Sequence, residues 1–190
     1  MELVLASRNA HKLRELERML GGAVRLIPLP DDVELPAETG DTYAANALIK
    51  ARAAAAATGR DAIADDSGIE AEALGGAPGV RSARFAGEDA SDEENLAKLR
   101  AQAPPGSGLR YVCVIAHVAA DGAEQLFEGD CRGTVSAEER GDDGFGYDPV
   151  FLPTERGGAR TMAELGPEEK DAISHRGRAA RALTAWLAGR

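Results

Sequence analysis

Apolar positions along the chain fall into short runs, typical of buried strands, and longer stretches with helical spacing. The first run is 3–5 (LVL), and a stretch over 13–20 then places leucines at helical spacing ahead of two glycines. A second run, 24–29, and an alanine-rich stretch, 44–59, repeat this order. Strand, polar loop and helix in succession predict an α/β fold.

The middle of the chain adds strands that no helix separates. Residues 61–66 predict a third strand, which ends in two adjacent acids. Residues 109–136 predict two long strands joined by Asp121-Gly122, a dipeptide that favours a hairpin turn. Antiparallel pairing among strand–helix units predicts a mixed sheet flanked by helices. No repeat, linker or change in composition divides the chain, so we expect one domain over 1–190.

Two more helices follow from local signals. Ser91 and Glu94 form a capping-box pattern ahead of a helix near 92–101. The final stretch of the sequence carries an apolar stripe at helical spacing, made of Ala179, Leu183, Trp186 and Leu187.

The net charge of the chain limits the kinds of molecule that it can bind. The chain carries 32 acids against 22 bases, a formal net charge of −10. This field disfavours polyanions, so we expect neither nucleic acid nor an anionic membrane as a partner, although a small phosphate ligand fits if cations gather locally. No apolar run approaches the roughly 20 residues of a membrane span, and we expect a soluble, cytoplasmic protein. Cys113 and Cys131 lie apart, which indicates two buried thiols and neither zinc nor a disulfide.

The segment SRNAHK, residues 7–12, lies where the first strand gives way to a helix. Backbone N–H groups and the positive end of the helix dipole collect at such a point, and Lys12 falls in the first turn, so the segment could hold a phosphate. It does not match the P-loop pattern. The alternative interpretation is an exposed, solvated lysine.

The segment DAIADDSG, residues 61–68, places Asp65 beside Asp66. Two carboxylates at a strand end suit a hard cation such as Mg²⁺, and Glu38 on a separate loop could add a third. The alternative is a turn in which Asp66 and Ser67 cap backbone amides.

Two later segments could meet a nucleotide. GFGYDPVF, residues 144–151, sets aromatic side chains among glycines, where a ring could stack on a base or simply anchor a tight turn. EEKDAISHRG, residues 168–177, gathers Lys170, His175 and Arg176, which could bind phosphate or carbonyl oxygens or could mark a solvated helix start.

In this order, SRNAHKLREL, ETGDTYAANALIKA, AIADDSGIEAEALGGAPGVRSARFAGEDA, GDDGFGYDPVF and EEKDAISHRG resemble the inosine triphosphate pyrophosphatases, also called HAM1-like proteins. The resemblance covers the chain from near its start to near its end. It implies an elongated mixed α/β fold of two lobes with a central cleft, assembled as a homodimer. It also implies Mg²⁺-dependent hydrolysis of purine nucleoside triphosphates, namely ITP, dITP and XTP, to the monophosphate and pyrophosphate, which would remove deaminated purines from the nucleotide pool.

The resemblance also implies residue roles. Asp66 would accept a proton and bind Mg²⁺ together with Glu38, and Lys50 would be catalytic. Substrate would be bound by Ser7, Arg8, Asn9, Ala10, His11, Lys12, Ser67, Phe145, Gly146, Tyr147, Asp148, Lys170, His175 and Arg176. The first loop departs from the family's usual Thr-Gly by having Ser7-Arg8. Two alternatives stay open: a Maf-like pyrophosphatase for other modified nucleotides, and a nucleotide-binding module without turnover.

Overall fold

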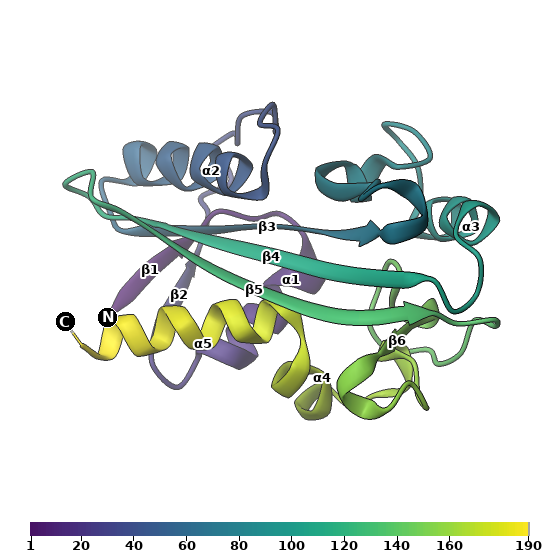
Figure 1. The fold of residues 1–190 in the computed structure, drawn as a ribbon. Coiled ribbons are helices and arrows are strands. Elements are labelled where there is room, and N and C mark those ends of the chain that lie inside the picture. The colour runs from purple at the N-terminus through teal and green to yellow at the C-terminus, as the bar shows by residue number, and fades with distance from the viewer. Residues whose placement is uncertain (190) are drawn as a thin grey trace. The chain divides into compact units, whose positions relative to one another are not determined.

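The computed structural model describes residues 1–189. The strands are β1 (Glu2–Leu5), β2 (Arg25–Pro28), β3 (Ala62–Ala71), β4 (Gly108–Val118), β5 (Glu124–Val135) and β6 (Phe151–Pro153). The α-helices are α1 (Ala10–Leu20), α2 (Tyr43–Thr58), α3 (Asp92–Gln102), α4 (Pro167–Ile173) and α5 (His175–Ala188), with short 3₁₀ turns between some elements (Figure 1). None of the described helices is both long enough and apolar enough to cross a membrane.

The strands form one six-stranded sheet in the order β2-β1-β3-β4-β5-β6. β1 pairs in parallel with β2 and β3, whereas β5 pairs antiparallel with β6. A tight turn at 119–123 joins β4 to β5 (Figure 1). The predicted mixed α/β fold is therefore confirmed, including its hairpin.

The chain divides into two compact units, and β3, β4 and β5 contribute residues to both. The first unit comprises Met1–Asp66, Cys113–Gly129 and the chain from Arg176 onward. The second unit comprises Ser67–Val112 and Asp130–His175. Each unit has hydrophobic clusters of its own.

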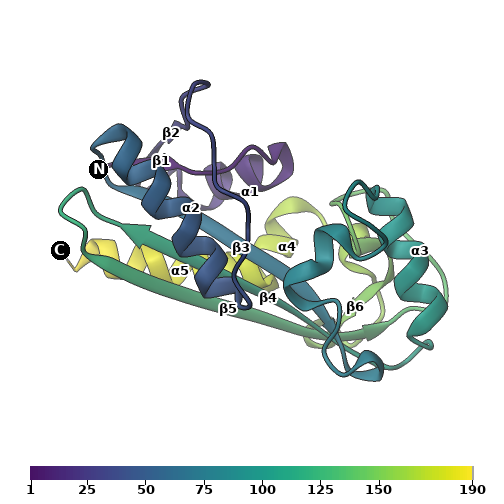
Figure 2. The ribbon, with the colours of Figure 1, turned by 90° about the horizontal axis from the view of Figure 1, so that it is seen from above.

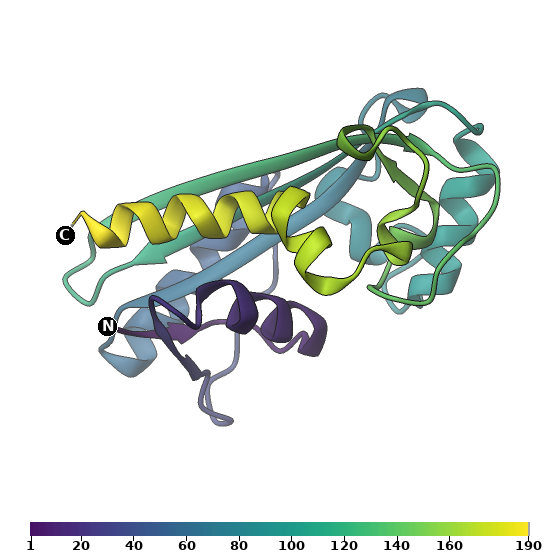
Figure 3. The ribbon, with the colours of Figure 1, turned by 90° about the horizontal axis from the view of Figure 1, so that it is seen from below.

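Helices cover both faces of the first unit's strands. α1 and α5 lie on one face (Figure 3). Their apolar side chains pack with residues of the strands that include Leu5 and Ile63. α2 lies on the other face (Figure 2). Its alanines pack with small residues of the strands that include Ala62 and Ala64. Successive residues of β3 thus alternate between the two clusters, as the period of two of a strand requires.

The ends of α2 follow local signals. The Thr42 hydroxyl accepts a hydrogen bond from Ala45 N at the N-terminus. Gly59 ends the helix with φ 63°, a left-handed conformation that glycine adopts without steric cost. The long alanine-rich helix therefore begins and ends where the sequence predicts.

The second unit is built around a core of aliphatic and aromatic side chains. Leu96 and Leu99 of α3 pack there with Tyr111, Tyr147 and Phe151. The Ser91–Glu94 capping box begins α3, as predicted. The two cysteines are buried free thiols, one in each unit, and burial raises the pKa of Cys113 to about 12.

Candidate active site

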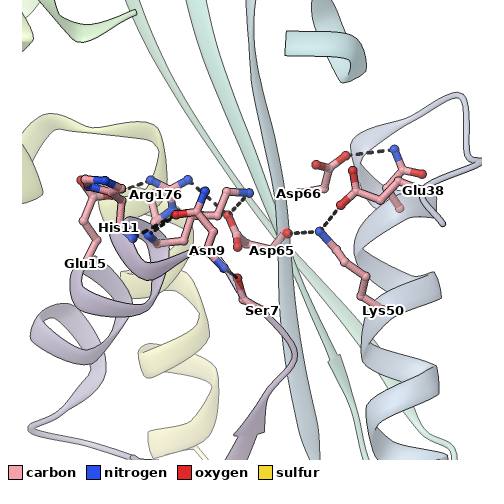
Figure 4. Close-up of polar contacts among 11 residues, drawn as sticks. Ser7, Asn9, His11, Glu15, Glu38, Lys50, Asp65, Asp66 and Arg176 are labelled. Carbon is pink, nitrogen blue, oxygen red and sulfur yellow. Dashed lines mark hydrogen bonds and ion pairs between the residues drawn. The ribbon is translucent and has the colours of Figure 1, made fainter. Parts of the chain in front are cut away.

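The two adjacent acids lie inside β3, because the strand continues to Ala71. The prediction that the strand ends at the acid pair is wrong, and so is the alternative of a capping turn at Asp66 and Ser67. Adjacent residues of a strand point to opposite faces. Asp65 accordingly faces α1 and α5, while Asp66 faces α2 (Figure 4).

Asp65 lies among cations. Its Oδ2 is 3.1 Å from Lys12 Nζ and accepts hydrogen bonds from Arg176 Nε and Nη2 at 3.3 and 3.2 Å. Arg176 also donates to the Glu15 carboxylate from Nη1 (Figure 4). Burial opposes ionisation of Asp65, but Lys12, Arg176 and Lys50 outweigh it and hold its pKa well below the ordinary value. Asp65 is therefore a permanent anion that neutralises cations.

The SRNAHK segment forms a capped helix start. Asn9 Oδ1 accepts hydrogen bonds from the backbone N–H groups of His11 and Lys12 at 2.9 and 3.1 Å, and Ser7 Oγ accepts from Asn9 N at 3.2 Å. The Lys12 side chain is only 15% exposed, so the interpretation of Lys12 as a solvated lysine is wrong. A phosphate bound here would meet Lys12 and the positive end of α1, with Asn9 already fixing the first turn.

Asp66 lies in different surroundings on the α2 side. Its Oδ2 accepts a hydrogen bond from Asn46 Nδ2 at 3.1 Å. Burial raises the pKa of Asp66, Lys50 opposes this, and the neighbouring Glu38 carboxylate raises it further. The net shift is upward, which makes Asp66 a stronger proton acceptor than an ordinary aspartate.

Lys50 of α2 binds both the loop that carries Glu38 and the strand that carries Asp65 and Asp66. Its ammonium donates to the Glu38 carboxylate and to the backbone oxygen of Asp65, the latter at 2.7 Å. Burial disfavours the charged lysine, but Asp65 and Glu38 outweigh this, and the pKa of Lys50 is raised. The lysine therefore stays charged beside Asp66 at neutral pH.

The Glu38–Asp66 pair fits a hard cation. Mg²⁺ is commonly held by one or two carboxylates together with substrate phosphates, so a protein need not supply a complete cage. Among residues 1–189, no group of three or more acids, histidines and cysteines forms such a cage. Burial is the main cause of the raised pKa of Asp66, and repulsion from Glu38 adds to it; a bound cation would relieve that repulsion.

A comparison with known proteins identifies the family. The model of the Ham1 family matches residues 3–186. The chain belongs to the Ham1 family. A Frankia alni protein named dITP/XTP pyrophosphatase is 52% identical over 199 residues, covering 98% of this chain and 97% of that protein.

Two solved structures share the fold as well as the sequence. A HAM1 protein from Coxiella burnetii superposes with a TM-score of 0.89 at 42% identity and full coverage of both chains. A Mycobacterium abscessus structure, described as a nucleoside-triphosphatase and dITP/XTP pyrophosphatase, gives a TM-score of 0.74 at 47% identity, covering 96% of this chain and 98% of that one. The predicted membership of the inosine triphosphate pyrophosphatase-like family is thus confirmed.

In the second unit, Asp148 is the centre of a buried hydrogen-bond network. Its carboxylate accepts from Lys170 Nζ at 2.7 Å, Tyr111 Oη at 3.1 Å and Phe145 N at 3.1 Å. Gly144, with φ 81°, lies against it, since an added Cβ would fall 2.2 Å from Asp148 Oδ2. The Asp148 carboxylate therefore holds the 144–148 loop through direct contacts.

The remaining second-unit candidates have mixed exposure. Tyr147 is buried and donates from Oη to Ser82 O at 2.7 Å, so this aromatic does anchor the loop. Phe145 is half-buried, with Lys170 Nζ 5.2 Å from its ring centroid. Ser67 is half-buried on β3, and Gly146 N donates to Asp92 at 3.0 Å.

The 168–177 segment is not a solvated helix start. Lys170, His175 and Arg176 are all buried. The His175 ring stacks on Tyr111 with centroids 4.6 Å apart and an interplanar angle of 9°. Lys170 and His175 belong to the second unit and Arg176 to the first, so the segment supplies side chains to both.

Arg8, which stands where the family resemblance implies glycine, binds a neighbouring loop. Its guanidinium donates to the carbonyl oxygens of Leu29, Pro30 and Val33 at 2.9, 2.6 and 3.1 Å. His11 and Ala10 follow it at the exposed start of α1, where the His11 ring bonds the Arg14 guanidinium. Arg8 thus joins the phosphate-loop candidate to the segment after β2.

Two residues of the site were not among the sequence candidates. Glu15 binds the Arg176 guanidinium, and Asn46 binds Asp66. A signal existed for Asn46, which lies four residues before Lys50 on the same helix face. No pattern in the sequence signals the role of Glu15, because its partner is 161 residues away.

Proposed function

We propose that this chain hydrolyses dITP, ITP and XTP to the nucleoside monophosphate and pyrophosphate and so removes deaminated purines from the nucleotide pool. The observation that carries the proposal is the Asp66 site: a buried carboxylate with a raised pKa beside Glu38 and the charged Lys50. The names of the relatives, dITP/XTP pyrophosphatase, supply the substrate class.

Asp66 acts as the proton acceptor for an attacking water. Asp66 is buried beside Glu38 and Lys50, and positioned general bases contribute about 10²- to 10⁴-fold to a rate. Asp65 does not share this role, because it faces the other side of β3 and stays ionised against Lys12 and Arg176. The two acids have separate functions.

Mg²⁺ is the cofactor, held by Glu38 and Asp66. When bound, it supplies charge neutralisation on the phosphate oxygens. Lys50 holds Glu38 in place and keeps a positive charge beside Asp66.

The triphosphate binds at residues 7–12. Lys12 and the N-terminus of α1 provide the positive charge, while Asn9 holds the first helical turn in shape. The nucleoside contacts inferred for Ser67, the 145–148 loop, Lys170, His175 and Arg176 remain predictions. A homodimer also remains a prediction, which light scattering after size-exclusion chromatography would test. The cytoplasmic location, expected because nucleotide pools are used there, is a prediction too.

The test is pyrophosphate release from ITP, XTP, GTP and ATP, each with Mg²⁺ and with EDTA. We expect metal-dependent release from ITP and XTP and little from GTP or ATP. Asp66→Asn, which keeps the shape and removes the base, should lower kcat by about 10²- to 10⁴-fold. Turnover that is unchanged in Asp66→Asn would refute the assignment of the base, and release from none of the purines would favour a binding module or another substrate class.

A further inference from the structure

Asn46 is completely buried on α2 and bonds two parts of the Asp66 site at once. Its Nδ2 donates to Asp66 Oδ2 at 3.1 Å. Its Oδ1 accepts from the backbone N–H of Gly40 at 2.8 Å. Because Gly40 lies two residues after Glu38, one side-chain amide connects the loop that carries Glu38 to the carboxylate of Asp66.

Gly40 fits closely against this amide. A Cβ added at Gly40 would lie 2.8 Å from Asn46 Oδ1 and 2.6 Å from Ala45 Cβ. The close approach of the loop backbone to α2 therefore requires glycine, without any unusual φ angle at this position. The backbone of the Glu38 loop therefore packs directly against α2.

Lys50 makes the second attachment one helical turn later. It donates to the Glu38 carboxylate and to Asp65 O, so α2 holds the loop and β3 through two residues, Asn46 and Lys50. Lys50 attaches by charge, which a cation bound at Glu38 would alter. Asn46 attaches through an uncharged amide whose hydrogen bonds, to Asp66 and to Gly40 N, do not involve Glu38.

We propose that Asn46 is a positioning residue that fixes the Glu38 loop and the Asp66 carboxylate relative to each other and so sets the affinity of this acid pair for a divalent cation. The inference rests on the proposed function, in which these two acids hold Mg²⁺. Residues that orient metal ligands by hydrogen bonding change metal affinity or activity by about 10- to 100-fold when they are mutated.

The first test compares Asn46→Leu with Asn95→Leu. Leucine keeps the branched shape of asparagine and removes both hydrogen bonds. Asn95 is the matched control, because it is also buried, accepts from Ala86 N at 2.8 Å and donates to Ala83 O at 3.1 Å in the second unit. Both variants should lose stability in urea, but only Asn46→Leu should lose metal affinity.

Metal affinity is measured directly with Mn²⁺ by electron paramagnetic resonance, with Mg²⁺ as competitor, in the absence of nucleotide. We expect the dissociation constant of Asn46→Leu to rise about tenfold or more and that of Asn95→Leu to stay within about twofold of the wild type. In the hydrolysis assay, the Mg²⁺ concentration for half-maximal rate should rise in parallel, while KM for ITP at saturating Mg²⁺ stays near the wild-type value.

A second pair of variants serves if Asn46→Leu does not fold. Gly40→Ala pushes the loop away from the amide without changing Asn46, whereas Gly22→Ala adds a methyl group in open space. Gly40→Ala should weaken Mn²⁺ binding and Gly22→Ala should not. Wild-type Mn²⁺ affinity in both Asn46→Leu and Gly40→Ala would overturn the inference and leave the proposed function standing, whereas a wild-type protein without metal-dependent hydrolysis would refute both.

Discussion

Replacing Asp65 by asparagine should destabilise the protein strongly, whereas the same change at Asp66 should not. The Asp65 side chain is 0% exposed. Its ion pair with Lys12 and its hydrogen bonds from Arg176 all involve the same oxygen, Oδ2. The asparagine side chain could keep an oxygen at the position of Oδ2 but not its charge. Removing one member of a buried ion pair costs about 3–5 kcal/mol.

The lower end of that range applies at Asp65. Arg176 keeps Glu15 as an anionic partner, and Lys12 is partly exposed and can reach water. One contribution acts the other way. The asparagine amide would occupy the buried Oδ1 position, where the present oxygen has no hydrogen-bond partner among residues 1–189, and an unpaired amide there adds to the cost. We therefore expect a loss of about 3 kcal/mol, which lowers Tm by about 6–12 °C for a chain of this size.

The pH dependence gives a second readout. The pKa of Asp65 is lowered in the folded state, so its stabilisation is fully present above the unfolded value of about 3.9 and is lost as pH falls towards the folded value. Wild type and Asp65→Asn should thus differ by a constant free energy of unfolding between about pH 5 and 8; the difference should begin to shrink below about pH 4 and vanish only as pH falls through the much lower folded pKa.

Asp66→Asn is the matched control, measured by urea unfolding without divalent metal. The pKa of Asp66 is raised in the folded state, so any stabilisation from this group exists below its unfolded pKa and disappears as pH rises through the folded value. At pH 7 its removal should leave stability unchanged or slightly higher. Asp65→Asn within about 0.5 kcal/mol of wild type would refute the assignment of Asp65 as the partner of Lys12 and Arg176.

Three further substitutions each test the contacts of one side chain. Lys50→Met leaves Glu38 without its buried ammonium and should cost about 1.5–3 kcal/mol by urea unfolding and lower the rate of pyrophosphate release. Tyr147→Phe leaves the Ser82 carbonyl without its buried donor and should cost about 1–3 kcal/mol, measured as a lower midpoint in urea at unchanged slope. Arg8→Gly frees the phosphate-loop backbone at an ordering cost of about 0.5–1 kcal/mol, so KM for ITP should rise about two- to fivefold with kcat near wild type, and an unchanged KM would contradict this role.

Local signals predicted most elements of the fold. The Ser91–Glu94 capping box, the end of α2 at Gly59 and the hairpin turn near Asp121-Gly122 each depend on residues within a few positions of one another. Such signals act through hydrogen bonds and backbone angles of the segment itself. They can therefore be recognised without knowledge of the tertiary structure.

The extent of β3 could not be recognised in this way. The polar run at 65–67 interrupts its apolar pattern and is typical of a loop. The strand continues because partners distant in the chain compensate the buried charges: Lys12 and Arg176 for Asp65, and Asn46 for Asp66. For the same reason, the burial of Arg176 and the partial burial of Lys12 were not apparent from their own surroundings in the sequence.

The period of two along β3 explains how neighbouring aspartates come to differ. Asp65 continues the face of Ile63, under α1 and α5, where Lys12 and Arg176 lower its pKa. Asp66 continues the face of Ala64, under α2, where burial and Glu38 raise its pKa. Opposite pKa shifts in adjacent carboxyl groups are what a site needs to hold one permanent anion and one base. The roles therefore follow from register rather than residue type, because a shift of one residue in the pairing of β3 would exchange the two faces and leave the base against the cations.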